Sequence, residues 1–287
     1  MTTLTAASLA LMLLGAQPEK PDGGALKWVG CDICKAAFMD DAVVAYEKKS
    51  GVKIGLEMTG DKQGIVAVAS GTHHLGGTCR HTRNVPEERG VKLVPVAWDA
   101  LVITVHPTNP VSSITAQQIR EVFTGKITNW KELGGKVAPI LAIEREGKAS
   151  GVGGAVRELL FHDPELEYAP SVLRLKSSNA VEVRCETEPN CLALTGISSA
   201  RLRPGLKVLA INGKEPSREN MISGEYVLYR PLYLSFPVAN ADPRVGPFVK
   251  WMLGAEGQAI IAKTGTVTLS EGKGLWEKYK AAIKGSK

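Results

Sequence analysis

Residues 114–134 read ITAQQIREVFTGKITNWKELG, and this stretch carries the assignment of the fold. Thr115 precedes an apolar-periodic segment and Gln118 follows three residues later, which is the pattern of a capping box at a helix start. Ile119 and Phe123 are four residues apart, so they lie on one face of that helix. We therefore predict a short helix that begins at Thr115 and buries this face.

The segments on both sides alternate between strand and helix patterns. Before the stretch, we expect strands over 26–29, 52–58, 93–96 and 101–105 and helices over 35–49 and 63–69. After it, we expect strands over 139–143, 172–175, 192–195, 206–211 and 232–236 and helices over 151–161, 244–263 and 274–284. Strands that alternate with helices predict an α/β fold with largely parallel sheets.

The bulk composition is that of a globular protein. The chain has 287 residues, of which 44% are hydrophobic and 22% charged, enough to bury a sizeable core. The formal charge of +6 suits an anionic ligand, but the basic residues are dispersed and aromatic residues make up only 6%. The absence of a basic, aromatic-rich stripe argues against a nucleic-acid partner.

Residues 1–24 read as a signal-like segment and linker. An apolar stretch over 4–16 ends in small residues, and Pro18 and Pro21 follow it. This order matches the apolar region and cleavage site of a secretory signal peptide, with cleavage expected after Ala16. The stretch is too short for a transmembrane helix. We therefore expect a periplasmic or secreted protein.

The stretch at 114–134 closely resembles a signature of phosphate-type periplasmic solute-binding proteins, the substrate-binding components of ABC transporters. In that family a helix leads into a "phe-x-gly-lys-x-thr-asn-trp" turn, and here Phe123-Thr-Gly-Lys-Ile-Thr-Asn-Trp130 follows it. The resemblance continues in order along the chain, roughly from residue 26 to residue 283. It is carried by 46–54, 96–111, 212–216, 223–226 and 230–236.

The resemblance implies a two-lobed type II periplasmic-binding-protein fold with two crossover strands and a ligand cleft. Lobe 1 would comprise 25–100 plus 231–287 and lobe 2 would comprise 101–230, each built on its own sheet. The crossings are expected near 99–105 and 230–236. The implied function is to deliver phosphate or a related small oxyanion to the membrane permease of an ABC transporter, as a monomer, without catalysis and without a cofactor.

Four loops match the family's ligand-holding positions, namely 30–35, 59–64, 76–80 and 145–151. Unpaired N–H groups and the helix dipole make helix N-termini suitable for anions. The resemblance implies that the ligand contacts Cys31, Asp32, Cys34, Thr59, Gly60, Thr78, Cys79, Arg80, Arg145, Ser150 and Gly151. Both arginines would make charge-assisted bonds to oxygen, and the serine would cap the helix that follows it.

The same loops depart from the family pattern in ways that weaken a phosphate site. Cys31 and Cys79 stand where serine is expected, and a thiol is a weaker donor than a hydroxyl. Val152 replaces a threonine, and Asp32 puts a carboxylate at the head of the first helix, where it repels an anion. The ligand is therefore predicted to be either a small anion or a soft species held by sulfur.

The five cysteines fall into two groups. Cys185 and Cys191 flank a loop with Pro189 and Asn190 as turn formers, and in an exported protein we predict a disulfide between them. For Cys31, Cys34 and Cys79 one reading is a disulfide within the set.

A second reading is a site for a soft metal ion or trivalent arsenic, with thiolates as ligands. Its residues would be Cys31, Cys34 and Cys79, with His73, His74 or His81 as further ligands. A third is a thiol–disulfide redox protein built on Cys31-x-x-Cys34. Covalent haem is disfavoured because Lys35, not histidine, follows the pair. The sequence contains no nucleophile elbow, phosphate loop or zinc-protease motif, so we expect no enzyme.

Overall fold

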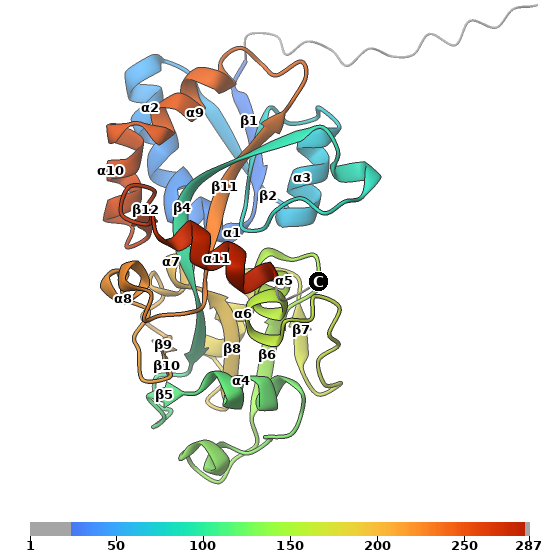
Figure 1. Cartoon of the computed structure of the whole chain (residues 1–287), viewed down its shortest axis with the longest axis vertical. Coiled ribbons are helices and arrows are strands. Elements are labelled where there is room, and N and C mark those ends of the chain that lie inside the picture. The colour runs from blue at the N-terminus through green and yellow to red at the C-terminus, as the bar shows by residue number, and fades with distance from the viewer. Residues whose placement is uncertain (1–23, 285–287) are drawn as a thin grey trace, which may run out of the picture.

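The computed structural model describes residues 24–284. The predicted signal-like segment over 1–24 lies outside the described residues, apart from Gly24. The described part forms two α/β lobes, one above the other in Figure 1, which confirms the predicted two-lobed fold. Within residues 24–284, every helix is too short or too polar to traverse a lipid bilayer.

Lobe 1 is built on three parallel strands with β1 in the middle. The strands are β1 (Leu26–Gly30), β2 (Ile54–Met58) and β3 (Leu75–Thr78). Figure 1 shows α2 (Asp40–Ser50), α9 (Val245–Leu253) and α10 (Ala255–Lys263) on one side of these strands and α3 (Asp61–Ala69) on the other. The short α1 (Asp32–Cys34) and the π-helical η1 (Lys35–Met39) lead from β1 into α2.

Two long antiparallel strands run between the lobes. They are β4 (Val91–Val105) and β11 (Tyr229–Pro237), paired from Tyr229 opposite Ala100 to Pro237 opposite Val91. The prediction of two separate strands over 93–96 and 101–105 was wrong, because β4 is continuous. Asp99 broke the apolar pattern in the sequence, but in the structure it pairs across the ladder with Arg230.

Lobe 2 is built on β8 (Cys191–Gly196), β6 (Leu141–Arg145) and β7 (Leu173–Leu175). Strand β6 is parallel to both neighbours, and β8 pairs antiparallel with the carboxyl half of β4. The helices are α4 (Ala116–Phe123), α5 (Gly151–Val156), the π-helical η4 (Arg157–Phe161), α6 (Ser178–Glu186), α7 (Ile197–Ala200) and α8 (Arg218–Ser223). The remaining short elements are η2 (Pro86–Glu88), β5 (Ser113–Ile114), η3 (Trp130–Leu133), β9 (Lys207–Val208), β10 (Ala210–Ile211) and β12 (Val267–Thr268).

Each lobe has its own set of paired strands, as expected, but strand β4 belongs to both sets and joins them. The strands follow a single path, β2-β1-β3-β11-β4-β8-β6-β7. Strand β4 changes partners along its length: Ala100 lies opposite Tyr229 of β11, and Leu101 lies opposite Gly196 of β8. A strand this long can serve both lobes because each half keeps its own hydrogen-bonding neighbours.

The stretch that carried the fold assignment forms the predicted helix α4. The Thr115 hydroxyl accepts from the backbone N–H of Gln118, and the Gln118 side chain accepts from the N–H of Thr115. Ile119 and Phe123 are fully buried. The capping box and the apolar face are both confirmed.

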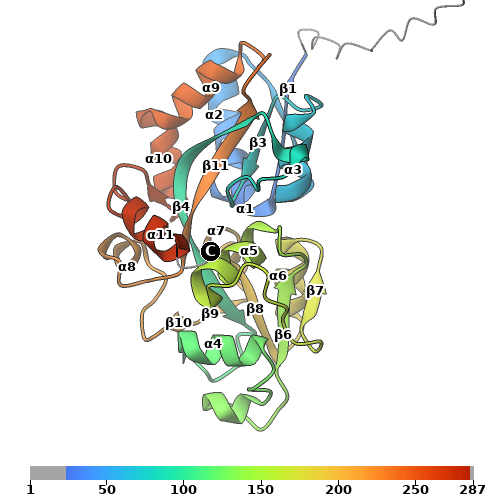
Figure 2. The same cartoon turned by 45° about the vertical axis from the view of Figure 1, so that its right-hand side comes forward.

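The predicted disulfide is also confirmed. Cys185 near the end of α6 and Cys191 at the start of β8 are bonded, with their Cα atoms 5.4 Å apart. The last helix, α11 (Leu275–Lys284), lies across the junction between the lobes in Figures 1 and 2. Its Trp276 and Tyr279 rings pack edge-on against Trp98 of β4, at centroid distances of 5.5 and 6.0 Å.

Candidate functional site

The four predicted loops meet at the junction between the lobes. Figure 2 shows α1 and α3 of lobe 1 directly above α5 and α6 of lobe 2. The first and third loops follow the carboxyl ends of β1 and β3, and the fourth follows β6. Because these strands end at the junction, the loops after them face one another there.

The carboxylate of Asp61 is at the centre of this junction, at the start of α3. Its Oδ1 accepts from the Thr78 hydroxyl at 2.9 Å and from the Cys79 backbone N–H at 2.8 Å. Its Oδ2 accepts from the backbone N–H of Gly151, in the other lobe, at 2.9 Å. Only 1% of Asp61 is exposed. Asp61 lies in the predicted loop over 59–64, but it was not among the predicted ligand-binding residues.

Asp61 is held in its ionised form. Burial by itself would raise the pKa of this carboxyl, because a charge is poorly solvated in the interior. The backbone N–H of Cys79, the charge of Arg80 and the N–H of Gly151 act in the opposite direction, and the net effect is a lowered pKa. The donors around Asp61 therefore form a set that stabilises negative charge.

Cys31, Cys34 and Cys79 are buried, and the structure has them as free thiols, not as the disulfide that was one prediction. The Sγ atoms of Cys31 and Cys79 are 3.5 Å apart, and the thiol of Cys79 donates to Asp61 Oδ1 at 3.3 Å. Burial raises the pKa of Cys34 to about 11. The pKa of Cys79 is also raised, by its contact with Cys31, by burial and by the charge of Asp61. The pKa of Cys31 is raised as well, first by its hydrogen bond with Cys34. All three sulfurs are therefore protonated at neutral pH.

The predicted soft-metal set assembles only in part. Cys31, Asp61 and Cys79 bring one ligand atom each within 4.8 Å of one another, and Cys34 is not in that group. The three histidines are engaged elsewhere, so their prediction as further ligands was wrong. His73 pairs with Glu57 at 3.0 Å, His74 accepts from the Lys27 backbone N–H at 2.8 Å, and His81 lies 3.6 Å from Glu158.

Arg80 links the two lobes by hydrogen bonds to residues of both. Its two terminal nitrogens donate to both carboxylate oxygens of Glu88, at 2.9 and 2.6 Å. Its Nε donates to the carbonyl of Ala149 in the fourth loop, at 2.7 Å. Only 7% of the Arg80 side chain is exposed. Arg80 thus holds two loops together and adds positive charge beside Asp61.

The remaining predicted residues lie around the same junction. Arg145 donates to the carbonyl of Glu146 at 2.8 Å, and its guanidinium lies so close to Gly60 that a Cβ there would overlap it. Ser150 caps α5 by accepting from the N–H of Gly153 at 3.0 Å, as predicted. The Thr59 hydroxyl is buried and lacks a hydrogen-bond partner among residues 24–284.

Asp32 contacts the other lobe as well. Its Oδ2 accepts from the backbone N–H of Asn179 in the first turn of α6, at 3.1 Å. Asp32 and Asp61 are thus two carboxylates of lobe 1 that accept from the helix starts of lobe 2. This placement is favourable because the N-terminal turn of a helix carries partial positive charge.

A buried ion pair lies next to the cysteines and was not predicted. Arg230 and Asp99 face each other across β11 and β4, with Nη1 and Oδ2 3.3 Å apart and both side chains fully buried. Among the described residues, the three side-chain nitrogens of Arg230 have no hydrogen-bond acceptor. Burial by itself would lower the pKa of Arg230, but Cys79 and Asp99 act in the opposite direction and the net effect is a raised pKa. The sequence did contain a signal for this ion pair: each of the two apolar strands carries one charged residue, and the two charges, on Asp99 and Arg230, are opposite.

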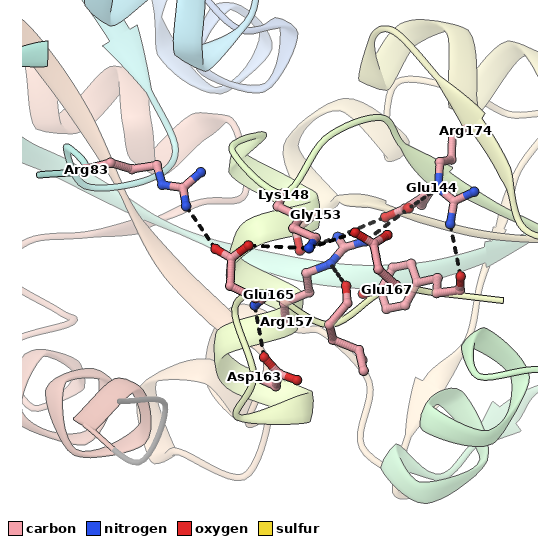
Figure 3. A network of polar contacts seen from close by, with 11 residues as sticks. Arg83, Glu144, Lys148, Gly153, Arg157, Asp163, Glu165, Glu167 and Arg174 are labelled. Atoms are coloured by element: carbon pink, nitrogen blue, oxygen red, sulfur yellow. Dashed lines mark hydrogen bonds and ion pairs between the residues drawn. The ribbon is translucent and has the colours of Figure 1, made fainter. Parts of the chain in front are cut away.

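A cavity of about 510 Å³ opens at the edge of the junction, between residues 80–84 and 148–165. Arg80 is the one predicted ligand-binding residue in its lining. Figure 3 shows the ion pairs beside it: Arg83 contacts Glu165 across the junction at 3.0 Å, and Lys148 contacts Glu165 at 3.3 Å. The ion pair between Arg83 and Glu165 thus adds a charged contact between the lobes at the edge of the cavity.

The sequence matches the family profile described as "PBP superfamily domain" over residues 35–256. The chain belongs to the PBP superfamily. The phosphate-binding protein PstS of Borreliella burgdorferi is 24% identical to this superfamily member over 245 residues, covering 83% of the chain and 88% of the relative. PstS of Pseudomonas aeruginosa is 28% identical over 246 residues, covering 76% and 75%.

A solved structure supports the same superfamily assignment. A Clostridium perfringens protein, described as a phosphate ABC transporter substrate-binding protein with bound phosphate, superposes with a TM-score of 0.78 at 26% identity. The match covers 85% of this chain and 99% of that chain. These relatives are described as binding proteins, and they lend no support to the soft-metal, arsenite or thiol–disulfide redox alternatives.

Proposed function

We propose that this protein is an extracytoplasmic solute-binding protein that holds inorganic phosphate, or a closely related small oxyanion, between its two lobes. The observation that carries the proposal is the set of donors at the junction. The Thr78 hydroxyl and the N–H groups of Cys79 and Gly151 all reach one carboxylate. Donors from both lobes that converge on a buried negative charge are suited to the oxygens of an anion.

Further groups at the junction support an oxyanion ligand. The Thr59 hydroxyl is a buried donor without a partner in the described part of the chain. Arg145 lies against Gly60, next to Asp61. The likeness to proteins named for phosphate binding supports phosphate as the first candidate ligand. The residues proposed to contact it are Cys31, Asp32, Cys34, Thr59, Gly60, Thr78, Cys79, Arg80, Arg145, Ser150 and Gly151.

The proposal extends to the lobes, the partner and the location. Lobe 1 would comprise 25–100 plus 231–287 and lobe 2 would comprise 101–230, with the ligand held between them. The loaded monomer would dock on the membrane permease of an ABC transporter outside the cytoplasm. Binding and release would need neither a cofactor nor catalysis.

Titration calorimetry of the wild-type protein and of Asp61→Ser tests the proposed ligand. The titrants are inorganic phosphate, arsenate, sulfate and arsenite. We expect at least one of the two proteins to bind phosphate saturably. In that protein the affinity for sulfate should be at least ten times lower than the affinity for phosphate. If neither protein binds phosphate or arsenate, or if arsenite alone binds, an oxyanion function is wrong.

A further inference from the structure

The Asp61 carboxylate makes the contacts that an oxyanion ligand needs. The function proposed above assigns the Thr78 hydroxyl and the N–H groups of Cys79 and Gly151 to the ligand. In the structure all three donate to Asp61 at 2.8–2.9 Å, and the Cys79 thiol donates to it as well at 3.3 Å. A ligand oxygen cannot take these donors while Asp61 keeps them.

Asp61 also holds the two lobes against each other. It belongs to lobe 1, whereas Gly151 belongs to lobe 2 and is 90 residues away in the sequence. A Cβ at residue 151 would lie 2.8 Å from both oxygens of Asp61 and would overlap Cys79 Sγ. Only glycine at position 151 therefore permits so close an approach of the Asp61 carboxylate to the start of α5.

The charges at the junction favour an ionised group at this point. Arg80, with 7% of its surface exposed, and Arg145 both act on Asp61 and lower its pKa. A buried carboxylate is stable only when such donors and charges compensate for lost hydration. The protein supplies that compensation to its own side chain, just as it would to a bound anion.

We propose that Asp61 is the affinity-determining residue of the oxyanion site: its carboxylate takes the place of the anion and keeps the lobes closed in the ligand-free protein. This inference rests on the proposed function. An incoming oxyanion must displace Asp61 and suffers repulsion from its charge. The wild-type protein is therefore a weak binder, and its closure does not depend on ligand.

The first test compares the phosphate affinity of wild type and Asp61→Ser by calorimetry. Serine removes the charge and supplies a hydroxyl donor, so Asp61→Ser should bind phosphate at least tenfold more tightly than wild type. Glu256→Gln is the matched control, because it removes one negative charge from an exposed ion pair with Lys49 on lobe 1. It should bind like wild type. Equal or weaker binding by Asp61→Ser overturns the inference, provided that wild type binds phosphate.

The second test needs no ligand and reports on closure. Hydrogen exchange of residues 149–154, followed by mass spectrometry, measures protection of the Gly151 amide. We expect protection in ligand-free wild type, loss of protection in Asp61→Ser and recovery when phosphate is added to that variant. Gly151→Ala provides a second route, because its methyl group expels the carboxylate and should remove protection while Asp61 is intact.

The outcomes separate this inference from the proposed function. If neither protein binds an oxyanion but wild type is protected and Asp61→Ser is not, the function is wrong and the closing role of Asp61 stands. If ligand-free wild type exchanges rapidly over 149–154 and gains protection only with phosphate, Asp61 does not hold the lobes closed and the inference is wrong.

Discussion

At the scale of single residues, the ion pair between Asp99 and Arg230 is the most demanding feature of the interior. The two residues lie in register on the two strands that connect the lobes, and both are fully buried. Asp99 also accepts from the backbone N–H of Ser198 at 3.0 Å. Burial raises the pKa of Asp99, and Arg230 opposes that effect. Each charge is therefore needed to compensate for the burial of the other.

We predict that Arg230→Met lowers the free energy of unfolding by about 3–5 kcal/mol, because it leaves the Asp99 carboxylate buried without its partner. The double variant Arg230→Met/Asp99→Asn should recover a large part of this loss, since it removes both charges. Urea denaturation of the two variants and wild type measures both effects. A single variant that costs less than about 1 kcal/mol would contradict the prediction.

At the scale of secondary-structure elements, short helices depend on their caps. Helix α4 has only eight residues, and its reciprocal capping box satisfies two backbone donors at its start. Ser150 and Ser217 cap α5 and α8 through a single bond each, accepting from the backbone N–H of Gly153 and of Asn220. A helix of this length gains little from propensity alone, so its cap and its buried face determine its stability.

Thr115→Ala should therefore lower the free energy of unfolding by about 1 kcal/mol, the usual cost of losing an N-cap. Ser112→Ala, at an exposed position three residues earlier, is the matched control and should change stability by less than about 0.5 kcal/mol. Chemical denaturation monitored by circular dichroism gives both values. If the two substitutions lower the free energy of unfolding equally, the N-cap at Thr115 makes no specific contribution to stability and the prediction is wrong.

At the scale of the whole molecule, the lobes share a hydrophobic core, and several polar or charged contacts also join them. They join Asp61 to Gly151, Asp32 to Asn179, Arg80 to Ala149 and Arg83 to Glu165. The contact of Asp61 with Gly151 is buried, and the pKa of the Asp61 carboxyl is lowered. The stability of the closed molecule should therefore depend on pH through Asp61.

The pKa of Asp61 is lowered in the folded protein, so its ionised form stabilises that state at neutral pH. This contribution is present above the unfolded pKa of about 4 and is lost as the pH falls through the folded pKa. We predict that wild type is more stable than Asp61→Asn at pH 7 and that the difference shrinks below about pH 4. Thermal unfolding of both proteins from pH 7 to pH 3 measures it. A difference that is constant over this range would contradict the prediction.

Much of the fold follows from the sequence by itself, because it depends on local patterns. The Thr115–Gln118 capping box, the apolar periodicity of α4 and the alternation of strands with helices each involve residues a few positions apart. The Cys185–Cys191 disulfide closes a short loop and is likewise local. The order of the resembling segments then implied two lobes. Such short-range patterns can be recognised in the sequence without knowing how the elements pack.

The centre of the candidate site was decided by the tertiary structure alone. The role of Asp61 depends on Gly151, 90 residues away, and the pairing of Asp99 with Arg230 depends on the register of β4 against β11. The continuity of β4 through both lobes also depends on partners that come from distant parts of the chain. Strand register and the approach of two lobes are set by the packing of the whole molecule, which no local pattern of residues encodes.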